Sequence, residues 1–259
     1  MGSLQGKRAL ITGGANGLGG AISLELAKRG AKIAVHWFQH RPDQNTVEDL
    51  AILREKVKAL GGEMVDVSGD LTDEATVKKV VQIAAEGLGG LDILVNNVGD
   101  LLGRRTLAEI DPSFLNRIMN INVNTMFLVT REALPHLVKA NGAAIVNLAS
   151  LAGRKGGHAG SLAYGTAKGA VITFTRSLST EVGPQGIRVN CVAPGFILGT
   201  YFHQTHTTAE SAQKTISEIP LGRAGNPQDI AEAVAFLAAQ YDGFITGVTL
   251  DVNGGVYMA

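Results

Sequence analysis

The chain has 259 residues, 45% of them hydrophobic, and its 23 basic residues balance its 23 acidic residues. A chain of this length buries about 70 to 75% of its unfolded surface, so a single domain over residues 1–259 needs no disulfide framework. Balanced charge without runs of like charge argues against nucleic acid and membrane lipid as partners, and the short apolar run near the N-terminus fits neither a signal peptide nor a membrane span.

Apolar runs and helical patterns alternate along the whole chain. The predicted strands cover 8–12, 32–38, 63–70, 91–97, 143–150, 187–194 and 247–252, and the predicted helices cover 19–30, 44–60, 73–88, 112–139, 162–182 and 227–240. Continuous apolar strands are typical of parallel sheets that helices cover on both faces. We expect an α/β fold, a Rossmann-type doubly wound sheet of seven parallel strands. Cys191, the only cysteine, is interpreted as a buried hydrophobe, which fits a cytoplasmic protein.

One segment, residues 198–226, departs from this alternation because it contains no predicted sheet strand. It follows the end of the sixth strand. Ligands of open α/β sheets bind at the carboxyl ends of the strands. The segment is therefore predicted to be a substrate lid.

The stretch ITGGANGLGGAI lies between the first strand and the first helix and carries Gly13, Gly17 and Gly19. The first glycine permits a sharp turn, the second lets a phosphate approach, and the third lets helix and strand pack closely. Free N–H groups at the helix N-terminus would receive a pyrophosphate, with Asn16 and Leu18 in the same loop. An ordinary glycine-rich turn is the alternative.

The end of the second strand bears on the choice of nucleotide. An acidic residue there would hold the ribose diol of NAD. This chain has Trp37 at that place, and no carboxylate appears in the tract 36–42. Arg41 could pair with a 2'-phosphate, although it could also be a solvated loop charge. NADP(H) is favoured and NAD(H) stays possible.

Tyr164 and Lys168 stand four residues apart in a predicted helix, so they share one face. A nearby ammonium favours the phenolate and lowers the pKa of a tyrosine from about 10. Such a pair can act as general acid and base, although the same spacing is common in plain surface pairs. Ser150, at the carboxyl end of the fifth strand, favours the catalytic interpretation.

Four motifs stand in a fixed order along the chain. They are T-G-x-x-x-G-x-G at Thr12–Gly19, N-N-V-G at Asn96–Gly99, Y-x-x-x-K at Tyr164–Lys168 and P-G at Pro194–Gly195. In these motifs and their order, the chain resembles the classical short-chain dehydrogenases/reductases over essentially its whole length.

The resemblance implies a role for each residue of the catalytic set. Tyr164 would donate or take the proton, and Ser150 would hydrogen-bond the substrate oxygen. Lys168 would lower the pKa of Tyr164 and bind the nicotinamide ribose, and Asn122 would hold the water of a proton relay. The hydride would come from the nicotinamide cofactor.

The resemblance also implies cofactor contacts beyond the glycine loop. Two residues after the third strand would cradle the adenine, the N-N-V-G residues would line the cofactor, and the P-G turn would place a backbone group at the carboxamide. These residues are Asp70, Leu71, Asn97, Val98, Gly99, Pro194, Gly195 and Ile197.

The chain departs from the family pattern at several positions. Val98 replaces the usual alanine, and Thr200 stands one position later than the usual threonine. Ser150 and Tyr164 are 14 residues apart, one more than is usual, so Ser161 is an alternative serine. Ser150 is preferred because it ends a strand.

Charged residues near the predicted site were considered for other roles. His158, His203 and His206 lack the carboxylate or cysteine that would complete a metal site, so no metal is expected. Arg104 and Arg105 could meet an acidic substrate, and a surface role is the alternative.

Four stretches of the sequence suggest two classes of substrate. GRAGNPQDIAEAVAFLAA and ITGVTLDVNGG resemble 3-oxoacyl-carrier-protein reductases, whereas NNVGDLLGRRTLAEID and AGRKGGHAG resemble reductases of keto-acids derived from uronic sugars. We expect an NAD(P)-dependent oxidoreductase acting on a small carbonyl or secondary alcohol. By family analogy it forms a homotetramer through the helices at 112–139 and 162–182 and the C-terminal strand.

Two other classes of protein stay open. A non-catalytic dinucleotide-binding subunit could use the same fold, but it would not need the intact set of catalytic residues. A nucleotide-sugar epimerase or dehydratase also uses tyrosine and lysine, but such relatives usually carry a longer C-terminal substrate domain.

Overall fold

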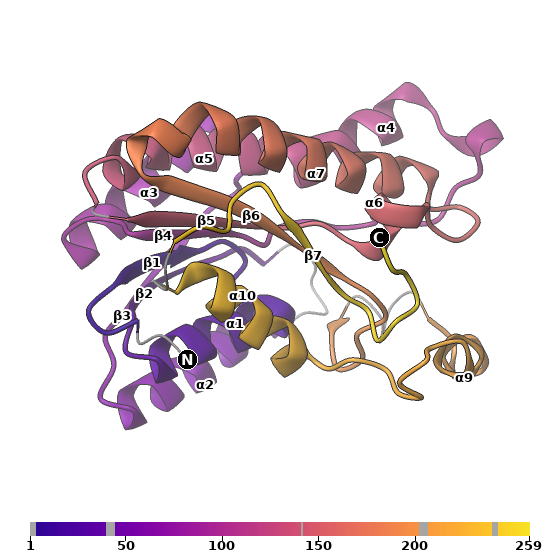
Figure 1. Ribbon diagram of the computed structural model, residues 1–259, viewed down its shortest axis with the longest axis horizontal. Helices are drawn as coiled ribbons and strands as arrows, with labels where there is room; N and C mark the ends of the chain where they lie inside the picture. Colours follow the sequence, from indigo (N-terminus) through magenta and orange to yellow (C-terminus); the bar gives the residue numbers. More distant parts are fainter. Residues whose placement is uncertain (1–3, 40–44, 141, 202–206, 240–242) are drawn as a thin grey trace.

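The computed structural model describes residues 4–39, 45–140, 142–201, 207–239 and 243–259. Seven parallel strands form one sheet in the order β3-β2-β1-β4-β5-β6-β7 (Figure 1). The strands are β1 (Arg8–Ile11), β2 (Lys32–Trp37), β3 (Met64–Ser68), β4 (Ile93–Asn96), β5 (Ala143–Leu148), β6 (Ile187–Pro194) and β7 (Thr249–Val252). From β1 the strands follow in one direction to β3, and β4 to β7 follow on the other side of β1. This order confirms the doubly wound parallel sheet predicted from the sequence.

Helices cover both faces of the sheet (Figure 1). On one face lie α1 (Gly17–Lys28), α2 (Thr46–Ala59) and α10 (Pro227–Ala238). On the other lie α3 (Glu74–Leu88), α4 (Pro112–Met119), α5 (Thr125–Leu137) and α7 (Leu162–Val182). Alternate residues of β1 therefore enter different cores, Ile11 packing with α1 and Leu10 with α3. Cys191 is buried and free, as expected.

The helix predicted over 112–139 contains a break in its hydrogen-bond pattern. Between α4 and α5 the chain forms a π-helix over Asn120–Asn124. The two α-helices and the π-helix are therefore continuous, with no loop between them. Such wide turns insert a residue and occur frequently at functional sites. Here the π-helix carries Asn122, whose side chain is buried.

Several short elements were not predicted. They are the helix α6 (Leu151–Lys155), the helix α9 (Ala209–Ser217) and the 3-10 turns Leu107–Glu109 and Gly183–Gln185. The helix α9 lies within 198–226, beyond the carboxyl end of β6 (Figure 1). Ile197 and Gly225 pair in an isolated bridge, which closes the base of this segment.

Within the described part of the chain, no helix has both the length and the apolar character that crossing a membrane requires.

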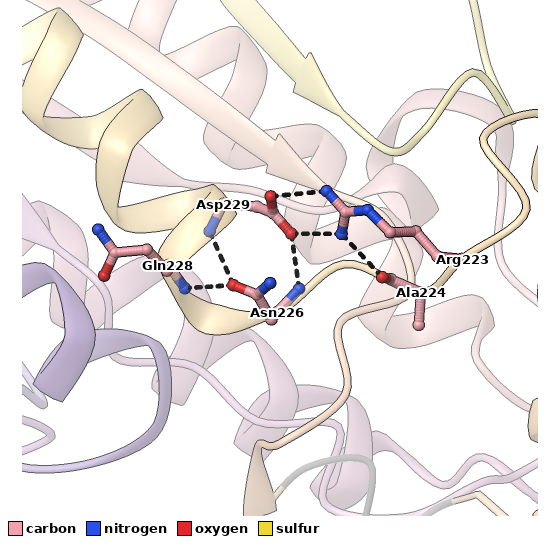
Figure 2. Close-up of polar contacts among 5 residues, drawn as sticks. All are labelled: Arg223, Ala224, Asn226, Gln228 and Asp229. Atoms are coloured by element: carbon pink, nitrogen blue, oxygen red, sulfur yellow. Dashed lines mark hydrogen bonds and ion pairs between the residues drawn. The ribbon is translucent and has the colours of Figure 1, made fainter.

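The start of α10 is fixed by a compact set of polar contacts (Figure 2). The side chain of Asn226 accepts hydrogen bonds from the backbone N–H groups of Gln228 and Asp229, at 2.9 and 3.2 Å. The Asp229 carboxylate in turn accepts from the Asn226 backbone at 2.8 Å and from both Nη atoms of Arg223. This capping box fixes where the 198–226 segment ends and α10 begins.

We expect Asn226→Ala to lower the free energy of unfolding by about 1 kcal/mol, because two N–H groups at the start of α10 would lose their acceptor. Chemical denaturation of the purified variant measures the change. Asn116→Ala, at an exposed position of α4, is the control and should stay within about 0.5 kcal/mol of the parent. An unchanged midpoint for Asn226→Ala would show that the cap contributes nothing to stability.

Candidate active site

The glycine loop joins β1 to α1 and has the backbone that a phosphate site requires. Gly13 and Gly17 have φ values of +58° and +53°, a region that favours glycine. A Cβ at Gly19 would lie 1.9 Å from the carbonyl oxygen of Gly13, so only glycine lets α1 begin here. A Cβ at Gly17 would meet no atom within 4 Å. The loop thus combines a sharp turn, tight helix packing and open space.

The first turn of α1 presents backbone N–H groups that no described side chain caps. Asn16 precedes this turn, and its Nδ2 lies 3.5 Å from the hydroxyl of Thr46 on α2. Leu18 packs against the core beneath the turn. Uncapped N–H groups at a helix N-terminus attract anions. The predicted pyrophosphate residues are therefore grouped around a surface that suits a phosphate.

The loop after β4 is locked to the glycine loop by hydrogen bonds. The hydroxyl of Thr12 accepts from the backbone of Asn97 at 2.9 Å, and Nδ2 of Asn97 donates to the carbonyls of Thr12 and Gly13, both at 3.0 Å. A Cβ at Gly13 would come within 3.2 Å of Val98. The structure therefore brings Asn97 and Val98 beside the glycine loop.

His36 also holds the glycine loop, a role that the sequence patterns do not predict. Its Nδ1 accepts from the backbone N–H of Gly13 at 3.1 Å, and its carbonyl accepts from Gly14 at 2.8 Å. Its Nε2 lies 2.8 Å from the carbonyl of Gly69 after β3. Because Nδ1 is an acceptor, the neutral ring carries its proton on Nε2 and donates it to Gly69. The imidazole thus joins two loops.

Burial lowers the pKa of His36 from 6.5 to about 4, against the opposing effects of the Gly69 hydrogen bond and the charge of Asp70. The other acidic residues on the neighbouring elements are occupied. Asp66 on β3 pairs with Arg54, and Asp73 caps α3. The 12–16 turn contributes no ionisable group. His36 is therefore neutral across the physiological pH range.

The predicted adenosine contacts lie at the ends of β2 and β3. Trp37 ends β2, and its indole Nε1 donates to Asp66 at 3.3 Å. Asp70 follows β3 and accepts two hydrogen bonds within its own turn. Leu71 is buried beside it. Arg41, the predicted partner of a 2'-phosphate, lies outside the described residues.

The predicted catalytic serine and tyrosine meet at the carboxyl end of β5. Ser150 caps α6 by accepting from the backbone of Ala152 at 3.1 Å, and its hydroxyl also hydrogen-bonds the phenol of Tyr164. Ser161 donates instead to the carbonyl of His158 at 2.6 Å. Of the two serines weighed from the sequence, Ser150 is thus the one whose hydrogen bond to Tyr164 the structure shows.

Lys168 and Asn122 complete this cluster around Gly99. The Lys168 ammonium donates to the carbonyl of Leu148 at 2.8 Å and lies 5.7 Å from the centre of the Tyr164 ring. A Cβ at Gly99 would lie 2.6 Å from Oδ1 of Asn122 and 2.8 Å from Nζ of Lys168. The two polar atoms therefore border one space, which a side chain at residue 99 would fill.

Asn122 is held by one half of its amide. Its Nδ2 donates to the carbonyls of Asp100 and Ile118, at 2.8 and 2.9 Å. Its Oδ1 is buried and has no hydrogen-bond partner among the described residues. A buried acceptor without a partner is costly, and a bound water commonly satisfies it. The geometry therefore suits a water between Asn122 and Lys168.

Burial has the largest effect on the charge state of the cluster. Loss of hydration raises the pKa of the half-buried Tyr164 to about 12, although the hydrogen bond from Ser150 opposes the rise. Burial also lowers the pKa of Lys168 to about 8. We expected Lys168 to lower the pKa of Tyr164. In this structure desolvation is the largest effect on the pKa of the phenol, and the lowering by Lys168 that the resemblance implies stays a prediction.

The P-G turn after β6 lies against the C-terminal strand. Gly195 donates its backbone N–H to Val252 at 2.9 Å, and a Cβ on it would lie 2.7 Å from Cβ of Asn253. Pro194 is the last residue of β6, and Ile197 is buried two residues past the turn. The turn therefore stands at the same edge of the sheet as Ser150.

The loops around residues 104 and 160 lie side by side. Arg105 donates its backbone N–H to Gly160 at 2.9 Å, and its guanidinium pairs with Asp111. Arg104 is exposed, with Nη1 3.4 Å from the carbonyl of Ala159. Arg105 is thus engaged by the protein, whereas Arg104 extends along the loop that leads to Tyr164.

The described residues contain no group of three side chains placed to hold a metal ion. Two of the histidines weighed for that role, His203 and His206, lie outside the described part of the chain.

The arrangement can exchange protons at a bound oxygen atom. A phenol and a hydroxyl are hydrogen-bonded to each other, and an ammonium and a free amide oxygen border the adjacent space. The phosphate-type loop stands at the same edge of the sheet, so a nucleotide bound there would extend toward the phenol.

Comparisons with known proteins agree with this geometry. The family model described as Enoyl-(Acyl carrier protein) reductase matches residues 13–257. The 3-oxoacyl-[acyl-carrier-protein] reductase of Vibrio cholerae serotype O1 is 35% identical over 260 residues, which cover 99% of each chain.

Two solved structures are similar over nearly the whole chain. A short chain dehydrogenase from Burkholderia cenocepacia, in complex with NADP, is 32% identical with a TM-score of 0.87, and 98% of each chain is covered. The NADH-dependent reductase A1-R', described as responsible for alginate metabolism, is 34% identical with a TM-score of 0.85, and 99% of each chain is covered.

We expect the free energy of unfolding to rise with pH between about 4 and about 6.5, because the unfolded chain binds more protons than the folded chain there. The stability that neutral His36 contributes is present above pH 6.5 and is lost as the pH falls toward 4. Denaturant unfolding at several pH values measures this slope.

The variant His36→Asn should show a shallower slope over the same range, whereas His158→Asn, which changes an exposed histidine, is the control. Equal slopes for the parent and His36→Asn would rule out His36 as the source.

Proposed function

Because this chain belongs to the short-chain dehydrogenase/reductase family of oxidoreductases, we propose that it reduces a ketone to a secondary alcohol with NADP(H). The observation that carries the proposal is the cluster of Ser150, Tyr164, Lys168 and Asn122 beside Gly99. A structural or regulatory subunit would need only the nucleotide loop. The intact cluster favours an enzyme.

In the proposed reaction, Ser150 hydrogen-bonds the substrate oxygen and Tyr164 gives it a proton. Tyr164 is protonated at neutral pH, as a proton donor in the reductive direction must be. The nicotinamide, when bound, supplies the hydride. Asn122 and Lys168 would hold a water in the space beside Gly99, through which the proton of Tyr164 is replaced.

The cofactor would lie along the glycine loop, with its pyrophosphate at the first turn of α1. The open space at Gly17 and the uncapped N–H groups support this placement. The proposed preference for NADP(H) rests on Trp37 and Arg41 of the sequence and on the NADP complex of the Burkholderia relative. The NADH-dependent relative keeps NAD(H) as the second choice.

The proposal also covers the domain, the lid, the oligomeric state and the cellular location. We propose one domain over residues 1–259, with residues 198–226 as the lid over the substrate, and the position of α9 beyond β6 supports it. We also propose a homotetramer formed through α4–α5, α7 and β7, since Phe127 and Leu162 expose large apolar surfaces on these helices. A cytoplasmic location agrees with the free, buried Cys191.

A second candidate substrate is a keto-acid derived from a sugar. Arg104 is an exposed cation on a loop that contacts the segment leading to Tyr164. A carboxylate on the substrate could pair with it. The similarity to the reductase described as responsible for alginate metabolism supports this choice. The similarity to the Vibrio cholerae enzyme supports an oxoacyl thioester instead.

We expect Tyr164→Phe to lower kcat by about 100- to 10,000-fold with either substrate class, because the variant loses its proton donor. The affinity for NADPH should change by less than about 2-fold. Steady-state kinetics with an acetoacetyl thioester and a 2-keto-acid, together with NADPH titration, measure both quantities. Tyr257→Phe, near Arg154, is the matched control and should keep its turnover. Retained turnover in Tyr164→Phe would remove Tyr164 from the mechanism.

If the substrate is a keto-acid, Arg104→Ala should raise its KM by about 10-fold or more, with kcat and the KM for a neutral ketone nearly unchanged. Lys58→Ala, which removes a cation on α2 at the other face of the sheet, should change neither KM. An equal KM for the keto-acid in the parent and in Arg104→Ala would reject the keto-acid assignment for this loop.

A further inference from the structure

His36 is the residue through which the two halves of the proposed adenosine site meet. The imidazole accepts from Gly13 in the glycine loop and donates to Gly69, which directly precedes Asp70. Its own carbonyl accepts from Gly14. One buried residue therefore makes three hydrogen bonds to the two loops that would contact the pyrophosphate and the adenine.

The hydrogen bonds of His36 hold the two loops in a fixed position. His36 is 2% exposed, so its imidazole bonds the Gly13 N–H and the Gly69 carbonyl from within the protein. Each ring nitrogen bonds a different loop, Nδ1 the glycine loop and Nε2 the turn after β3. An apolar side chain would fill the space but leave a part-buried donor and a part-buried acceptor without these partners, which costs free energy.

We propose that His36 is a positioning residue for the cofactor, fixing the distance between the glycine loop and the Asp70–Leu71 turn. It touches neither the reacting atoms nor the catalytic cluster in the structure. Its effect is thus on how tightly the adenosine half of the dinucleotide is bound, not on the rate of the chemical step. The inference rests on the proposed function, because it assigns the two loops to a dinucleotide.

The variant His36→Phe keeps an aromatic ring, slightly larger than the imidazole, and removes both polar atoms. It should weaken the binding of NADPH and of ADP-ribose 2'-phosphate by the same factor, about 10- to 100-fold. The value of kcat at saturating NADPH should change by less than about 3-fold. Isothermal titration calorimetry gives the affinities independently of the neighbouring Trp37. His36→Asn, which keeps an amide acceptor and donor, should lie between the parent and His36→Phe, and it takes the place of His36→Phe if that variant fails to fold.

The matched control is Arg188→Met. Arg188 is also a buried polar side chain on a strand, and it donates to the carbonyls of Leu237 and Ala239 at 2.8 and 2.9 Å, near the amino end of β6. Its loss should reduce stability without changing the affinity for NADPH. Equal weakening in Arg188→Met and in the His36 variant would show a general loss of structure and overturn the inference.

Two further results separate the inference from the proposed function. If the parent protein binds NADPH and the His36 variants bind it equally tightly, His36 has no positioning role and the proposed function stands. If the parent protein binds neither NADPH nor NADH, the proposed function fails, and the inference fails with it.

Discussion

Burial of the central strands on both faces is the constraint on which the rest of the structure depends. Every residue of β5 and β6 is buried, so polar groups inside the sheet must find partners there. Asn147 does so by bonding Asn96 on β4 and Thr175 on α7. Groups that exchange protons with a ligand are left to the carboxyl edge, where the strands end and loops begin. Ser150 and Gly99 stand at this edge because β5 and β4 end just before them.

The same loss of water sets the charge of the site. Burial moves the pKa of three different groups toward their neutral forms, raising that of Tyr164 and lowering those of Lys168 and His36. The glycine loop likewise offers N–H groups rather than cations. The site of this chain therefore combines fixed dipoles and neutral hydrogen-bond donors with the ammonium of Lys168.

The sequence predicted the architecture because each strand is a continuous apolar run and each long helix has a clear period. The end of a strand and the spacing within a helix also indicated that Ser150, Tyr164 and Lys168 lie near one another, while their catalytic roles stay predictions. His36 was missed because it looks like one more member of a buried strand, and its partners are backbone atoms distant in sequence. The spacing of Tyr164 and Lys168 shows the neighbouring ammonium but not the desolvation, which raises the pKa of the phenol. The π-helix and α6 lie below the length at which periodicity is informative.

The π-helix at Asn120–Asn124 limits where residues can be inserted into or deleted from this chain. Its extra residue sets the rotation of α5 relative to α4, since each residue of a helix turns the chain by about 100°. Deleting one residue would restore a regular helix but would turn Met126 and Val129, which are buried, away from the core. Side chains in this stretch are thus open to substitution at exposed positions. Its length, in contrast, is fixed by the phase of two helices, since α5 must face the sheet and α4 must face α7.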